Sequence, residues 1–133
     1  MLHKVSFMKS LVNYLSTLVH FLYTFGHLKC DISDYDEECI IIGDGGVANI
    51  KIDKKFSCSD HNYIIKSKYN KYIYYYLINN IKLLEDGFKG SALKNISKSF
   101  LNDLKIPIPK TDEKINYWIE KLSLQYNLYL YQI

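Results

Sequence analysis

A glycine-rich tetrapeptide between two apolar runs constrains the fold of this chain more than any other feature. The tetrapeptide is Gly43-Asp44-Gly45-Gly46, and the apolar runs occupy residues 39–42 and 47–52. β-branched residues favour strands, and glycine adopts turn conformations that other residues avoid. The sequence therefore predicts two strands joined by a glycine-rich turn.

The next apolar segments predict a third strand and a helix. Residues 62–66 have the short apolar pattern of a strand. Across residues 69–85 the apolar positions recur at helical spacing, and Asp86-Gly87 provides a stop. The apolar positions of that helix are Ile73, Leu77, Ile81 and Leu84.

Two prolines separate this region from the end of the chain. Residues 104–108 have the pattern of a short strand at an edge or terminus, because Pro107 and Pro109 cannot donate ladder hydrogen bonds. Thr111 is placed to cap a final helix, with Asp112 and Glu113 near its positive end.

The final helix has a heptad pattern of apolar residues. Successive positions are four, three, four, three and four residues apart, which lines one face of a helix. The segment holds fewer heptads than a secure coiled-coil assignment needs, but the face should pack on another helix. The positions are Ile115, Ile119, Leu122, Tyr126, Tyr129 and Ile133. The whole pattern predicts an α+β fold, with a mixed sheet, packed helices and a C-terminal helix of coiled-coil type.

The first 25 residues differ in composition from the rest. No residue from Ser10 to Leu28 carries a formal charge, and the length would suit a membrane span. Polar residues including Asn13 and His20 interrupt the apolar run, and no small-residue cleavage site follows it. A three-four spacing of apolar residues from Val5 to Leu22 favours a packed helix over a membrane segment.

Charge and cysteine content limit the functional classes. The net charge of +3 is compatible with nucleic-acid binding without arguing for it alone. All 17 basic residues are lysine, so the arginine fork that commonly recognises guanine is absent. The three cysteines lack paired spacing, which favours free thiols and an intracellular, cytoplasmic protein.

No pattern singles out an active site, and we expect no catalytic residue, cofactor or metal. The glycine turn fits neither a Walker loop nor a dinucleotide fingerprint. Cys58 and His61 have the spacing of one zinc-ligand pair, but no second close pair accompanies them. The acidic run at residues 34–38 is more typical of a solvated loop than of a catalytic pair.

A basic polar run at residues 89–98 is the remaining candidate. Lys89 and Lys94 are positioned to meet phosphates, and Ser91 and Asn95 carry groups that can bond to base edges. By composition alone this run is a surface loop, because surface lysines are common.

The order of these segments resembles the target recognition domains of type I restriction-modification specificity subunits. The acidic residue, apolar strand and glycine turn at residues 35–50 are similar to one family element, and residues 56–61 to the next. Gly90-Ser91 followed by Asn95-Ile96-Ser97 resembles the family's Gly-Ser and Ile-Ser segments. Residues 104–109 resemble its Ile-Pro-Pro strand, and the resemblance extends over about residues 21–130.

The resemblance implies a DNA-binding module without catalytic activity. Such a module gives sequence selectivity to a DNA adenine methyltransferase subunit and, in some systems, to a restriction subunit. The implied site faces double-stranded DNA with the turn of Asp44, Gly45 and Gly46 and the loop of Lys89, Ser91, Lys94 and Asn95. Because a full specificity subunit has two recognition domains, the chain corresponds to a half-subunit that forms a homodimer through its terminal helix.

The expected division of the chain has three parts. Residues 1–20 form a divergent apolar helix that matches no family element, residues 21–110 the recognition domain, and residues 111–133 the dimerisation or spacer helix. Glu113-Lys114 stands where the family usually has Glu-Gln. The alternative interpretation is a degenerate remnant that no longer binds DNA and acts only as a helix-mediated interaction protein, tethered to a membrane or free.

Overall fold

The computed structural model describes residues 34–132. The predictions for the apolar N-terminal segment therefore lie outside the described residues. None of the helices formed by residues 34–132 is long and apolar enough to cross a membrane.

A small antiparallel sheet forms the centre of the described fold. The strands are β1 (Cys39–Gly43), β2 (Lys51–Asp53) and β3 (Asn62–Ile65), in the order β2-β1-β3. Ile40 of β1 lies opposite Ile52 on one side and Ile65 on the other. The strands predicted at 39–42 and 62–66 are confirmed, and so is the α+β class. Both strand pairs are antiparallel, so the expected mixture of strand directions does not occur among these strands.

The strand predicted at residues 47–52 begins later than expected. The Asn49 side chain accepts a hydrogen bond from the Gly43 amide at 3.0 Å and donates one to the Val47 carbonyl at 2.9 Å. These bonds fold residues 44–50 into a loop, and β2 pairs with β1 only from Lys51 onward. The predicted tight turn is therefore a wider loop that Asn49 closes.

The two faces of β1 pack into different clusters, as the alternation of side chains along a strand requires. Ile40 and Ile42 are fully buried in the main core, which α2 covers. Cys39 and Ile41 point to the other face, where they pack with Phe56. There the Tyr35 and Phe56 rings stack with centroids 4.8 Å apart.

The helix predicted at residues 69–85 is divided in two. α2 (Asn70–Asn79) is followed by the short α3 (Lys82–Glu85), which ends at the predicted stop. At the break, the Asn80 side chain donates a hydrogen bond to the Tyr76 carbonyl at 2.8 Å. Asparagine competes for backbone partners in this way and so favours helix ends over helix interiors.

The segment before the final helix differs from the prediction. Residues 98–103 form a helix, α4 (Lys98–Asp103), which Ser97 caps by accepting a hydrogen bond from the Phe100 amide at 3.1 Å. The strand predicted at residues 104–108 is wrong, since these residues pair with none of the described strands. Pro107 and Pro109 lack donors, and the Pro107 carbonyl instead accepts from the Tyr72 hydroxyl at 2.6 Å.

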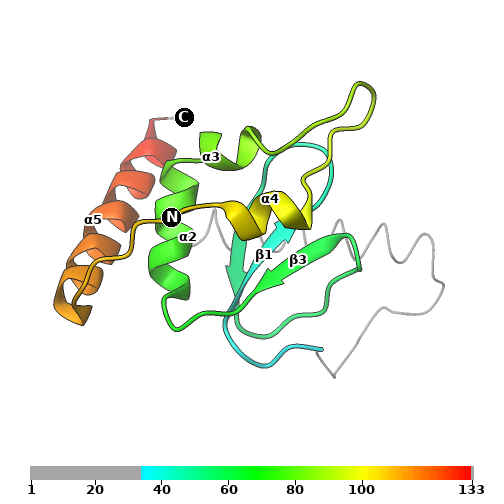
Figure 1. The fold of residues 1–133 in the computed structure, drawn as a ribbon. Helices are drawn as coiled ribbons and strands as arrows, with labels where there is room; N and C mark the ends of the chain where they lie inside the picture. The colour runs from blue at the N-terminus through cyan, green and yellow to red at the C-terminus, as the bar shows by residue number, and fades with distance from the viewer. Residues whose placement is uncertain (1–33, 133) are drawn as a thin grey trace.

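The final helix, α5 (Asp112–Tyr131), begins where the capping pattern predicts. The Thr111 hydroxyl accepts a hydrogen bond from the Lys114 amide at 3.3 Å. α5 runs alongside α2 on the side away from the sheet (Figure 1). Ile115 is buried in the main core, and Ile119 and Leu122 pack against it. Part of the predicted heptad face is therefore used within the chain itself.

Candidate functional site

The structure brings the two predicted DNA-facing segments together at one end of the sheet. The Gly46 amide donates a hydrogen bond to the Lys94 carbonyl at 2.9 Å, and the Ile96 amide donates to the Asp44 carbonyl at 2.8 Å. Gly45 and Asn95 pair as an isolated antiparallel bridge. The loops at residues 44–50 and 89–95 thus lie side by side, at the upper right of Figure 1. Below they are called the joined loop surface.

The loop at residues 89–95 is closed by its own backbone. Lys89 and Asn95 exchange two hydrogen bonds, each 2.9 Å long. Gly90 has a φ of 142°, and a Cβ there would lie 2.1 Å from the Leu93 carbonyl oxygen. Because L-residues are strained in that conformation and the space is filled by backbone, this loop shape depends on glycine at position 90.

All of the predicted contact residues except Asp44, which is half-buried, are exposed on this surface. Lys89, Ser91, Lys94 and Asn95 have exposed side chains, and the backbone of Gly45 and Gly46 is exposed as well. Asn95 also leans toward the glycine loop, because a Cβ on Gly45 would lie 2.9 Å from the Asn95 Oδ1. A side chain at position 45 would displace the Asn95 amide.

The joined loop surface is anchored to the core beneath it. Ile96, the residue after the closed loop, is only 2% exposed. Its carbonyl accepts a hydrogen bond from the Tyr63 hydroxyl of β3 at 3.2 Å. A Cβ on Gly87 would lie 2.4 Å from the Phe100 ring, so the segment just before the loop at residues 89–95 approaches α4 closely. The loops are therefore held at both ends by the packed part of the molecule.

A third loop contributes a residue that the sequence did not identify as part of this site. The Asp44 amide donates a hydrogen bond to the His61 carbonyl at 3.0 Å, and the His61 Nδ1 lies 3.3 Å from the Asp44 Oδ2. The His61 side chain is largely exposed, and that of Asp44 is about one-third exposed. In the sequence, His61 has only the spacing of a possible zinc-ligand pair with Cys58. The resemblance of residues 56–61 to a family element was the only other signal.

Apart from His61, the residues considered for metal or acid-base chemistry lie elsewhere and serve other contacts. Within residues 34–132, no group of three or more His, Cys, Asp and Glu side chains is arranged to hold a metal ion. Cys58 packs beside the cluster of Cys39 and Phe56, and burial raises the pKa of both thiols. In the acidic run, Glu37 forms an ion pair with Lys66.

A hollow of about 490 Å³ lies where the N-terminal turns of α2 and α5 meet. Its lining mixes charges of both signs with apolar side chains, and Tyr72 and Ile115 belong to the main core. The predicted contact residues line no part of it. The full lining is Glu38, Lys68, Tyr69, Lys71, Tyr72, Asp112, Ile115, Asn116 and Ile119.

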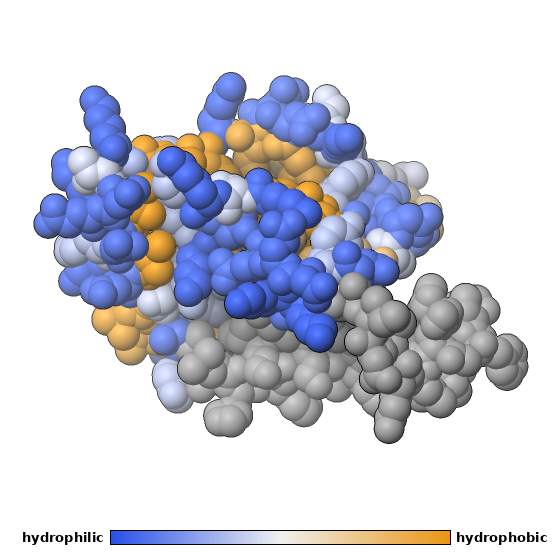
Figure 2. All heavy atoms as spheres, turned by 90° about the horizontal axis from the view of Figure 1, so that it is seen from below, coloured by the Kyte–Doolittle hydropathy of each residue, from blue (hydrophilic) through white to orange (hydrophobic). Residues whose placement is uncertain are grey.

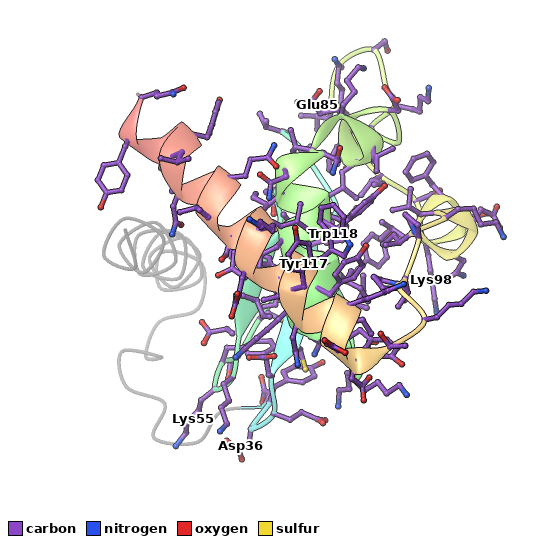
Figure 3. The ribbon with its side chains drawn as sticks, turned by 90° about the vertical axis from the view of Figure 1, so that its left-hand side faces the viewer. Asp36, Lys55, Glu85, Lys98, Tyr117 and Trp118 are labelled. Atoms are coloured by element: carbon purple, nitrogen blue, oxygen red, sulfur yellow. The ribbon has the colours of Figure 1, made fainter. Side chains whose placement is uncertain are left out.

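The outer face of α5 is a second exposed feature. Large apolar side chains emerge on it between hydrophilic ones, and Figure 2 shows such mixed patches on the α5 side of the molecule. Figure 3 looks onto this side, where Tyr117 and Trp118 are labelled. Their rings meet edge to face with centroids 5.5 Å apart, and the Lys121 Nζ lies 5.5 Å from the Tyr117 ring centroid. Below, the outer face of α5 means Tyr117, Leu124, Leu128 and Tyr131, each more than half exposed.

Comparison with known proteins identifies the family. The model of the type I restriction modification DNA specificity domain matches residues 7–125, which is most of the chain. No curated protein and no solved structure gives a significant match. The matched range contains β1 to α4, both loops of the joined loop surface and most of α5. The chain therefore belongs to the type I restriction modification DNA specificity domain family.

Proposed function

We propose that this protein is the sequence-selective DNA-binding module of a type I restriction-modification system. The observation that carries the proposal is the joined loop surface, on which the loop at residues 89–95 presents lysine, serine and asparagine side chains beside the glycine loop at residues 44–50. Base and phosphate contacts commonly come from loops that a rigid scaffold positions, and here backbone hydrogen bonds fix the loops.

The residues have separate expected roles on duplex DNA. Lys89 and Lys94 contact phosphates, which sets the salt dependence of binding. Ser91 and Asn95 bond to base edges, and an asparagine amide suits adenine in the major groove. Gly45 and Gly46, which lack side chains, let the backbone come close to the DNA. Asp44 shapes the loop through its bonds to Ile96 and His61.

The chemistry belongs to the partners of this module. A DNA adenine methyltransferase subunit, with or without a restriction subunit, would act at the site that this protein selects. Specificity domains of this family have no catalytic role of their own, and we expect the same of this chain. Since chromosomal and invading DNA are the substrates of such systems, we expect the protein to work in the cytoplasm.

The proposed homodimer uses the outer face of α5. The first half of the predicted heptad face packs on α2, so that face cannot serve a second copy along its whole length. On the outer face, Tyr117, Leu124 and Tyr131 are spaced seven residues apart, and Leu128 lies between the last two. Heptad spacing of this kind suits a second α5 helix. A two-fold dimer would bind a split, symmetric site.

The first experiment is a fluorescence-anisotropy titration of the purified protein against random duplex DNA at two salt concentrations, followed by sequencing of the bound fraction. Enrichment of a split, symmetric sequence with salt-sensitive affinity supports the proposed function. Absence of binding at low salt contradicts it and favours the alternative, an interaction protein that retains only helix packing.

Two substitutions separate the roles on the joined loop surface. Lys94→Gln should weaken binding to every sequence and reduce the salt slope by about 1, because one phosphate contact is lost. Asn95→Ala should instead relax selectivity at one position, and an equal loss on all sequences would refute its role in base recognition. Lys110→Gln, which removes an exposed lysine beside the start of α5, is the matched control.

A test of the dimer uses sedimentation equilibrium. Leu124→Lys together with Leu128→Lys should convert a dimer to a monomer, because like charges would face each other across the pair of helices. If the unaltered protein sediments as a monomer at all concentrations, the homodimer is ruled out, whereas DNA binding by single copies is not.

A further inference from the structure

Two large aliphatic side chains are exposed on the joined loop surface itself. Val47 is 82% exposed and Leu93 is 79% exposed, more than any other large apolar side chain among residues 34–132. Neither packs against the main core or the smaller cluster. These two side chains therefore contribute nothing to the core of the described residues, and exposed apolar groups that lie together can mark an interaction site.

Val47 and Leu93 lie beside the same hydrogen bond between the two loops. Val47 follows Gly46, and Leu93 precedes Lys94, and the Gly46 amide and Lys94 carbonyl are bonded at 2.9 Å. Each aliphatic residue is thus one residue away from the joint between the loops. Lys94 and Asn95 follow Leu93 directly, so an apolar, a cationic and an amide side chain are consecutive in this loop.

The chemistry of duplex DNA offers one partner for such a pair. In the major groove, thymine is the base that presents an apolar group, its C5-methyl, and aliphatic side chains contact it. The chain contains no arginine, so its base recognition has to rely on other contacts than the guanidinium fork. Flanking lysines supply attraction to phosphates, which keeps the apolar pair against the groove.

We propose that Val47 and Leu93 are specificity-determining residues that contact thymine C5-methyl groups in the major groove. This inference rests on the proposed function, and it adds the base class that the joined loop surface selects. Burial of one methyl group against an aliphatic side chain corresponds to about a fourfold change in affinity. Two such contacts give about a sixteenfold preference for thymine over a base that lacks the methyl group.

The test replaces thymine by deoxyuridine, one position at a time, in the duplex obtained from the selection experiment. Deoxyuridine keeps the hydrogen-bonding groups of thymine and removes only the methyl group. The full-length protein should lose about fourfold in affinity at each contacted thymine. Val47→Ala and Leu93→Ala should each bind the thymine duplex more weakly and should each become insensitive to the replacement at one position.

Controls separate this inference from the function on which it rests. Ile108→Ala removes another exposed aliphatic residue, next to Pro107, which is bonded to α2, and it should keep the full response to deoxyuridine. Thermal unfolding of the variants should be unchanged, since both side chains are exposed. If the protein binds a selected sequence but replacing thymine by deoxyuridine does not change its affinity, the inference is wrong and the DNA-binding function stands. The same conclusion follows if both alanine variants respond to deoxyuridine as strongly as the unaltered protein does. If no duplex binds at all, the proposed function itself fails.

Discussion

The joined loop surface and the α2–α5 contact are held together by different forces. Backbone hydrogen bonds between Asp44, Gly46, Lys94 and Ile96 fix the loops, while the contact side chains point outward. Between α2 and α5, buried side chains such as Leu77 and Ile115 carry the contact. The structure of the loops should therefore tolerate replacement of exposed side chains but not replacement of glycine. The packing of the helices should instead be sensitive to replacement of buried side chains.

The largest effect should come from the helical side. Leu77, which is 1% exposed, lies in the core that α2 forms with its neighbours. Leu77→Ala should lower the free energy of unfolding by about 2–5 kcal/mol, because it leaves a cavity that the packed helices cannot fill. Urea denaturation measures this change. A loss no larger than that of an exposed replacement such as Leu128→Ala would break the comparison.

Gly90→Ala should have the next largest effect, on binding rather than on global stability. Alanine at a φ of 142°, against the Leu93 carbonyl, strains the closed loop. A strain of about 1–3 kcal/mol corresponds to a loss of DNA affinity of about 5- to 150-fold. Anisotropy titration checks the affinity. Ala92→Ser, at an exposed position of the same loop that has no proposed DNA contact, is the control, and it should leave the affinity unaltered.

Alkaline pH should weaken the helical side selectively. Burial, followed by the nearby Tyr126, raises the pKa of the Tyr74 phenol above its usual value. A raised folded-state pKa means that stability is complete below the unfolded-state pKa of about 10 and falls as the pH rises beyond it. The urea midpoint should drop above about pH 10, with a slope of up to about 1.4 kcal/mol per pH unit from this group. Tyr74→Phe should flatten that slope, and an unchanged slope would contradict the assignment.

The smallest effect is expected at the start of α5. Thr111→Ala removes the acceptor for the Lys114 amide and should cost about 1 kcal/mol of stability. Thr111→Ser, which keeps the hydroxyl, should recover most of it. Circular dichroism during thermal unfolding would show the change, and an equal loss in both variants would place the role of Thr111 in its methyl group instead.

Local patterns were sufficient to predict the elements that depend on local forces. The isoleucine run of β1, the Thr111 cap and the Asp86-Gly87 stop all acted as expected. The predicted helices and strands were wrong where a side chain forms a hydrogen bond with the backbone. Asn49 delays β2, Asn80 divides the predicted helix, and the Tyr72 hydroxyl occupies the carbonyl of Pro107.

The sequence predicts that both loops face DNA, but it does not predict the hydrogen bonds that join them. Lys89, Ser91, Lys94 and Asn95 are exposed as expected. Their junction with Asp44 and Gly46 depends on hydrogen bonds between segments far apart in sequence, which no local pattern encodes. For the same reason the sequence could not show that His61 lies beside Asp44, or that α5 uses part of its heptad face within the chain.

The bond between the Ile96 amide and the Asp44 carbonyl also bears on the order of folding. It closes a long stretch of chain that contains β2, β3, α2 and α3. Such a contact forms only after the loop-closure entropy of the intervening chain has been lost, a cost that falls once those elements are packed. During synthesis, the joined loop surface would therefore assemble after the sheet and its covering helix, so an incomplete chain would have a core before it had this surface.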